Sequence, residues 1–291
     1  MIRLDAATVL LQWAVGGMAF CWFTTRRRIA SPGYGWLLRG IYGAMAGVAV
    51  TAGVAFGAVP VREASAAGVA VACVVVLAVS VARRRGGGAG ARAERERRRA
   101  RVGAMTGIDR RAEGRLEPAG TTGPEFPPLL DLVPVAIGLV GLVAAGLDAA
   151  DGTGATMVSL VRTIAGAAFL GAVSDAMLLG HWYLTQPGLP RRLLHELVDA
   201  VGWVWPVEVV ALLLPTGMVS VWTGAVDDGW NGTLGWFWGA SAVTTIVLVV
   251  VTKAALRERE YSAVMAATGL LYLAILTAFG TDLVARAVLA G

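Results

Sequence analysis

Residues 67–82 read AGVAVACVVVLAVSVA, a run without one charged side chain. From Val71 to Val81 it consists almost entirely of valine and alanine. A helix needs about 20 apolar residues to cross the ~30 Å hydrocarbon core of a bilayer, so this run is short for a span. It nevertheless decides the fold, because the charges on its two sides are consistent only if it crosses the membrane.

Seven further apolar runs accompany this one, and most have the length of a membrane span. They are Ala6–Phe23, Leu37–Val59, Leu129–Leu147, Met157–Leu179, Trp203–Trp222, Leu234–Thr252 and Ser262–Leu289. The chain of 291 residues is 56% hydrophobic and only 15% charged, whereas soluble domains carry about a quarter charged residues. The sequence therefore predicts an all-α, polytopic membrane bundle of about eight transmembrane helices.

Positive charge alternates along the connections between these runs. Basic residues follow the first, third, fifth and seventh runs: Arg26, Arg27, Arg28, twelve arginines between Arg83 and Arg115, Arg191, Arg192, Lys253, Arg257 and Arg259. The opposite connections are nearly free of them, with only Arg62 in residues 61–65 and none in 148–156 or 224–233. By the positive-inside rule the basic loops are cytoplasmic and both termini lie on the non-cytoplasmic side of the cell membrane. Without the run at 67–82 the arginine-rich loop would lie outside, so the alternation requires that span.

One long polar stretch, residues 83–128, interrupts the apolar pattern. It contains three glycines at 86–88, an Arg/Glu-rich tract at 92–101, and prolines at its end. This composition is typical of a flexible connector, and the alternative is a basic patch that docks on anionic lipid or on a partner subunit. The chain is thus divided into an N-terminal three-helix group (1–82), a cytoplasmic linker (83–128) and a C-terminal five-helix group (129–291).

Composition also argues against several classes of protein. The formal net charge is +5, but the arginines lie in short loops rather than on an aromatic-interleaved face, so no nucleic-acid partner is expected. Cys21 and Cys73 both lie within apolar runs and allow neither a disulfide framework nor a metal pair. His181 and His195, the two histidines, flank a turn instead of facing each other across two helices, which argues against haem and against a metal site.

Ionisable side chains inside apolar runs are costly and usually face the bundle interior or water, so they are the best pointers to a site. The predicted outer set is Arg162, Asp282 and Arg286. Asp282 and Arg286 are four residues apart and can pair on one helix face, and Arg162 would join them if the fifth and eighth helices touch. The favoured interpretation is an outer ion pair near the headgroups, with the arginines reaching to water.

The predicted inner set, nearer the cytoplasmic face, is Asp175, His181, Glu208 and Tyr272. Glu208 follows Pro206, which removes one helical hydrogen bond and predicts a kink in the sixth helix. Since Asp175 and Glu208 belong to consecutive helices, we expect them to face each other and to raise each other's affinity for a proton, as in a proton or cation relay. The alternative is that each carboxyl is protonated or is capped by a neighbour such as Ser174, and merely locks two helices together.

The most distinctive string is GHWYLTQP at residues 180–187, which brings an imidazole, an indole and a phenol to the cytoplasmic end of the fifth helix. Aromatic rings around a titratable histidine are suited to stacking on a flat ring and moving its proton. The alternative is an interfacial aromatic collar, in which His181 caps the helix end.

These patterns predict a membrane subunit of an energy-transducing, respiratory or redox complex, and whether the chain is an enzyme stays open. His181 and Tyr183 would contact a quinone head group, and Asp175 and Glu208 would lie on a proton path. We expect no cofactor bound firmly by this chain, with quinone as the candidate, and membrane or redox subunits as partners. Two alternatives are a transporter of a small solute or ion with a proline-broken sixth helix, and a structural or assembly subunit without a site.

Overall fold

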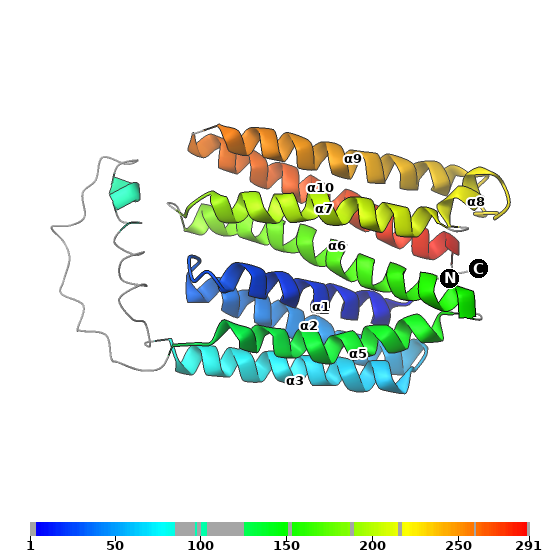
Figure 1. The fold of residues 1–291 in the computed structure, drawn as a ribbon, viewed down its shortest axis with the longest axis horizontal. Coiled ribbons are helices and arrows are strands. Elements are labelled where there is room, and N and C mark those ends of the chain that lie inside the picture. Colours follow the sequence, from blue (N-terminus) through cyan, green and yellow to red (C-terminus); the bar gives the residue numbers. More distant parts are fainter. Residues whose placement is uncertain are drawn as a thin grey trace.

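The computed structural model describes residues 4–84, 97, 100–103, 125–150, 153–186, 189–214, 217–258 and 260–289. These residues form helices and no strand, and Figure 1 shows long helices side by side in one elongated bundle. The start of α1 and the end of α10 lie at one end of it, which we call the terminal end, and the end of α3 and the start of α5 lie at the other, the linker end. The prediction of an all-α, polytopic membrane bundle is confirmed.

Eight of the described helices have 17 residues or more and run the length of the bundle. They are α1 (Ala6–Thr25), α2 (Pro32–Phe56), α3 (Pro60–Ala82), α5 (Leu132–Asp148), α6 (Thr153–Thr185), α7 (Arg192–Leu213), α9 (Thr233–Arg257) and α10 (Tyr261–Leu289). The short elements η2 (Pro128–Asp131) and α8 (Met218–Trp222) precede α5 and α9. The run at 67–82 lies within α3, so that helix begins well before its uncharged stretch.

Local sequence fixes where the first helices begin. The carboxylate of Asp5 caps α1 by accepting hydrogen bonds from the backbone N–H groups of Ala7 (3.1 Å) and Thr8 (3.3 Å). Helices α2 and α3 start with Pro32 and Pro60, at positions where the missing N–H of proline leaves no helical bond unmade.

Seven of the described helices are long and apolar enough to cross a membrane, namely α1, α2, α3, α5 together with η2, α6, α9 and α10. The eighth, α7, lies alongside them (Figure 1). Its first half carries Glu196 and Asp199 among its apolar residues, so its composition is less apolar than that of a typical span.

The predicted sixth span was placed wrongly. Helix α7 begins at Arg192, eleven residues before Trp203, and ends at Leu213, whereas the end of the predicted run forms the separate helix α8. The helix is also continuous through Pro206 and is not broken there. Beside this proline the indole N–H of Trp205 donates to the carbonyl of Ala242 (2.9 Å), which ties this part of α7 to α9. Pro215 lies outside the described residues.

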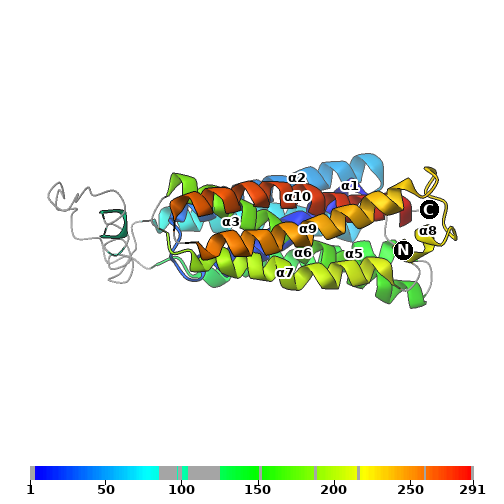
Figure 2. The same cartoon turned by 90° about the horizontal axis from the view of Figure 1, so that it is seen from above.

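Helix α6 is the centre of the bundle, because α1, α5, α7 and α10 all pack on it. In the second view α2 and α10 lie toward one edge of the bundle and α5 and α7 toward the other (Figure 2). Helices α1 and α6 approach each other closely: a side chain at Gly16 would overlap the carbonyl of Ala167, and one at Gly171 would overlap the backbone of Gly16. Small residues are what allow two membrane helices to approach so closely.

Candidate functional site

Buried polar side chains gather at two depths in the bundle. The first group, which we call the Glu208 cluster, lies toward the terminal end and consists of Arg162, Glu208, Asp282 and Arg286. The second, the Asp175 cluster, lies toward the linker end and consists of Tyr34, Tyr42, Ser174 and Asp175. Each member of both groups is at most 3% exposed.

In the Glu208 cluster, Asp282 and Arg286 form the ion pair that their spacing predicts. The guanidinium of Arg286 donates to both carboxylate oxygens of Asp282, at 2.7 and 3.1 Å. It also donates to the side-chain oxygen of Gln12 on α1 (2.6 Å), and the Gln12 amide donates to the carbonyl of Thr163 on α6. The pair is completely buried, so Arg286 is held by protein groups and does not extend to the headgroups.

Contrary to the prediction from the sequence, Arg162 does not join the Asp282–Arg286 ion pair; it bonds to the backbone of α7 instead. Its guanidinium donates to the carbonyls of Ala211 (2.8 Å) and Leu214 (3.2 Å), at the end of α7. Residue 215 is a proline and has no N–H with which to satisfy the carbonyl of Ala211. Arg162 supplies that donor from α6 and thereby caps α7.

Glu208 lies in this cluster and not beside Asp175. Its carboxyl group faces Asp282, with the charges of Arg286 and Arg162 nearby. The side chain is fully buried, and neither carboxyl oxygen has a hydrogen-bond partner among the described residues. The prediction placed Glu208 in the other half of the bundle because it started the helix at Trp203. With the start at Arg192, Glu208 lies one turn from the terminal end of α7.

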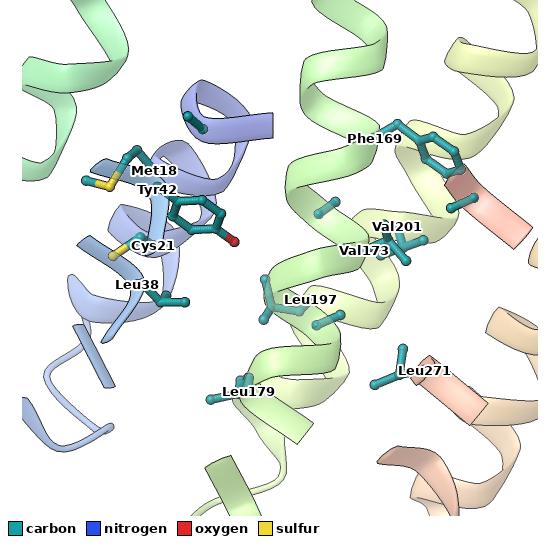
Figure 3. Packing of buried hydrophobic residues seen from close by; sticks show 14 of the residues in the cluster. Met18, Cys21, Leu38, Tyr42, Phe169, Val173, Leu179, Leu197, Val201 and Leu271 are labelled. Carbon is teal, nitrogen blue, oxygen red and sulfur yellow. The ribbon is translucent and has the colours of Figure 1, made fainter. Parts of the chain in front are cut away.

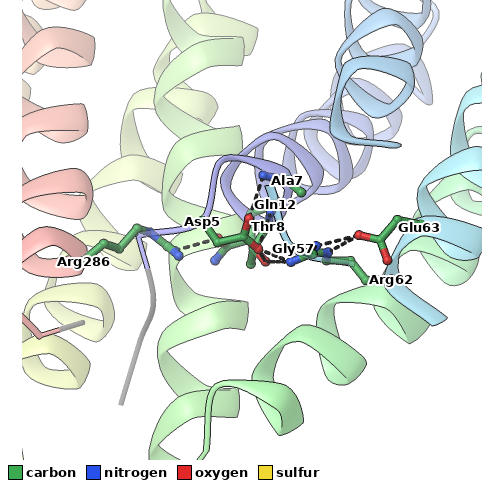
Figure 4. Close-up of polar contacts among 8 residues, drawn as sticks. All are labelled: Asp5, Ala7, Thr8, Gln12, Gly57, Arg62, Glu63 and Arg286. Atoms are coloured by element: carbon green, nitrogen blue, oxygen red, sulfur yellow. Dashed lines mark hydrogen bonds and ion pairs between the residues drawn. The ribbon is translucent and has the colours of Figure 1, made fainter. Parts of the chain in front are cut away.

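A second group of polar side chains, centred on Arg62, lies between the terminal end and Arg286 of the Glu208 cluster (Figure 4). Arg62 of α3 pairs with Asp5 and Glu63 and donates to Thr8 (3.0 Å) and to the carbonyl of Gly57 (2.6 Å). A small cavity with room for about one water molecule is lined by Asp5, Thr8, Arg62, Ala145, Asp148, Ala149, Thr163 and Arg286. The cavity thus brings Arg62 and Arg286 to the same space. Sequence reasoning had counted Arg62 only as a loop charge.

The Asp175 cluster joins α6 to α1 and α2. One oxygen of Asp175 accepts a hydrogen bond from the hydroxyl of Tyr42, and Figure 3 shows that hydroxyl pointing from α2 toward α6. The neighbouring Ser174 accepts from the indole of Trp13 (2.7 Å). The second oxygen of Asp175 and the hydroxyl of Tyr34 are buried and have no hydrogen-bond partner among the described residues. Neither tyrosine was singled out from the sequence.

The two clusters are separate. Arg162 and Asp175 are thirteen residues apart on α6, which corresponds to about 20 Å of helix. The Gly16–Gly171 crossing of α1 and α6 lies between them. Asp175 and Glu208 therefore do not face each other, and the expectation that they do is wrong.

The aromatic residues of the stretch 180–187 lie in two different environments. His181 and Tyr272 of α10 meet at 3.1 Å through the histidine Nδ1 and the tyrosine hydroxyl, and both side chains are exposed on the flank of the bundle. Tyr183 is buried and donates to the carbonyl of Pro190 (2.6 Å), which holds the turn between α6 and α7. The structure thus joins His181 with Tyr272 and gives Tyr183 a position apart from them.

A further buried ion pair closes the linker end. Arg39 of α2 donates to both carboxylate oxygens of Asp131, at 2.7 and 2.8 Å, and lies over the ring of Phe126. The pair ties the segment that follows the linker to α2. Arg39 is a lone charged residue within the apolar run 37–59, and such a residue indicates a buried polar contact. It was not among the candidate residues predicted from the sequence.

No protein-family model matches this chain, and neither curated proteins nor solved structures give a match.

Proposed function

We propose that this protein is a proton-handling subunit of an energy-transducing complex in the cell membrane, and that Glu208 and Asp282 hold the proton. The observation that carries the proposal is the carboxyl group of Glu208, fully buried in an apolar bundle without a hydrogen-bond donor from the described residues.

The charges around Glu208 support a site that gains and loses a proton. An ionised carboxyl without donors costs several kcal/mol to keep in an apolar interior. Asp282 already has Arg286 as its partner, and Arg162 is engaged by the carbonyls at the end of α7. Two neighbouring carboxyls that share one site favour uptake of a single proton between them. The contact between the carboxyls of Glu208 and Asp282 supports a site for one proton between them.

The cavity between Arg62 and Arg286 supports access from the terminal end. Polar side chains, Arg62 and Arg286 among them, line it beside two alanines, and it has room for about one water molecule, so water at that side would reach Arg286, the partner of Asp282. The positive-inside rule gives the direction: Arg26, Arg191 and Lys253 lie at the linker end, which we assign to the cytoplasm. The Glu208 cluster then faces the outer side.

The test is infrared difference spectroscopy on the protein in nanodiscs, stepped between acidic and alkaline pH. We expect a protonated-carboxyl band that Glu208→Gln removes or shifts. The matched control is Asp227→Asn, which changes an exposed carboxyl in the loop at the same end of the bundle and should leave the band in place. A band that survives Glu208→Gln unchanged would contradict the proposal.

The assignment to a complex has its own test. After purification in a mild detergent, mass spectrometry should find other membrane or redox subunits in fixed ratio to this chain. If the chain purifies alone and by itself carries protons into dye-loaded liposomes, the subunit assignment fails and the chain acts as a stand-alone transporter.

A further inference from the structure

The His181–Tyr272 pair combines two polar groups on a flank of the bundle that otherwise faces lipid. The pair joins α6 to α10 at 3.1 Å, and Tyr272 is 43% exposed. Its neighbours on the outer face of α10 are apolar, with Leu273 and Leu276 exposed by 53% and 68%. An exposed polar group at such a position needs a hydrogen-bond partner, because hydrocarbon offers none.

The pair has one hydrogen-bond donor to spare, whichever tautomer the imidazole adopts. If the hydroxyl of Tyr272 donates to Nδ1 of His181, then Nε2 carries the hydrogen and points away from the bond. If Nδ1 donates instead, the hydroxyl of Tyr272 is the spare donor. Neither residue makes another hydrogen bond to the described part of the chain. The missing partner is therefore an acceptor that approaches from the lipid side.

Toward the terminal end the same stripe becomes apolar and aromatic. Its members follow the pair at three- and four-residue steps, with Met177 on α6 and Ile275 and Phe279 on α10, all of them half-buried. The rings of Trp13 and Phe279 meet edge to face with centroids 4.4 Å apart, and Trp13 donates to Ser174. A flat ring with an acceptor at its edge would lie along this stripe and hydrogen-bond to the pair.

We propose that His181 and Tyr272 bind the head group of a lipid-soluble quinone, whose carbonyl oxygen accepts the spare hydrogen. A quinone is neutral, flat and soluble in the bilayer, and its carbonyl is an acceptor without a competing donor. A lipid phosphate is the competing acceptor, because His181 lies four residues from the end of α6 although Tyr272 lies eleven residues into α10, and a phospholipid photoprobe distinguishes the two. The inference deepens the proposed function by naming the substrate class, and it rests on the assignment to an energy-transducing complex.

The experiment is photolabelling with an azido-quinone of the protein in nanodiscs, followed by mapping of the labelled peptides. We expect saturable labelling around residues 177–184 and 268–276 that excess unlabelled quinone prevents. His181→Phe and Tyr272→Phe should each weaken quinone binding about tenfold, the effect of one lost hydrogen bond. The control is Trp203→Phe, which changes an exposed aromatic ring on another helix, α7, and should leave binding unchanged.

Two outcomes would overturn the inference. In one, labelling spreads over the lipid-facing surface and does not depend on the two side chains. In the other, a phospholipid photoprobe labels the same peptides and quinone does not compete, which assigns the pair to lipid. The Glu208→Gln variant separates this inference from the proposed function: it should lose the carboxyl band and still bind quinone with the wild-type affinity.

Discussion

At the scale of single residues, Arg162 of α6 satisfies backbone carbonyls at the end of another helix, α7. Helix α7 ends before a proline, which has no N–H to donate to the carbonyl of Ala211 four residues earlier. The guanidinium that satisfies this carbonyl comes from α6, forty-nine residues earlier. Position 162 therefore links the central helix to the end of the helix that carries Glu208.

Removal of this arginine should lower the stability of the folded bundle. Arg162→Leu leaves the carbonyls of Ala211 and Leu214 without donors, at a cost of about 1–3 kcal/mol for each buried group. We expect a clearly lower melting temperature in a tryptophan-fluorescence scan of the detergent-solubilised protein. Arg192→Leu is the matched control, because that side chain is 74% exposed and pairs only with Glu196. Equal melting temperatures for the two variants would contradict the capping role.

At the scale of helices, the Gly16–Gly171 crossing sets how closely α1 packs on the central helix α6. Gly16→Ala places a methyl group into the carbonyl of Ala167, and such overpacking costs about 1–3 kcal/mol. Gly47→Ala makes the same change on α2, where nothing lies within 4 Å. At that position alanine should stabilise the helix by about 0.8–1 kcal/mol relative to glycine. We expect shifts of opposite sign in the thermal unfolding of the two variants. Shifts of the same sign would show that the crossing does not limit packing.

Most helices could be predicted from the sequence, but the grouping of polar residues could not. Long and mainly apolar runs identified seven of the long helices, since burial in lipid favours apolar side chains along most of the length. Helix α7 differs: its first half includes Glu196 and Asp199, and the eleven-residue error in its start moved Glu208 from one polar cluster to the other. Tyr42 could not be recognised as the partner of Asp175, because contacts between helices depend on rotation about their axes, which the pattern within one run does not give.

At the scale of the whole molecule, the distribution of charge predicts how the bundle sits in the membrane. Cys21 and Cys73 are buried, so an introduced cysteine would be labelled against a low background. A membrane-impermeant maleimide should label Asp227→Cys in intact cells and Arg84→Cys only in lysed cells, because the two exposed positions lie at opposite ends of the bundle. The reverse pattern would place the linker outside and overturn the orientation given by the positive-inside rule.

The close crossing of α1 and α6 also has an electrical consequence. Polar groups and water at the two ends of a bundle shorten the distance over which a transmembrane voltage falls, so the field is concentrated in the dry layer between them. Here that layer contains the Gly16–Gly171 crossing, with the Glu208 cluster on one side and the Asp175 cluster on the other. A charge moved across the whole membrane potential gains or loses about 2.3 kcal/mol per 100 mV. A proton that binds at the proposed Glu208 site from the terminal end would be held at the edge of this thin insulating layer, so on our proposal the occupancy of that site should respond to voltage as well as to pH.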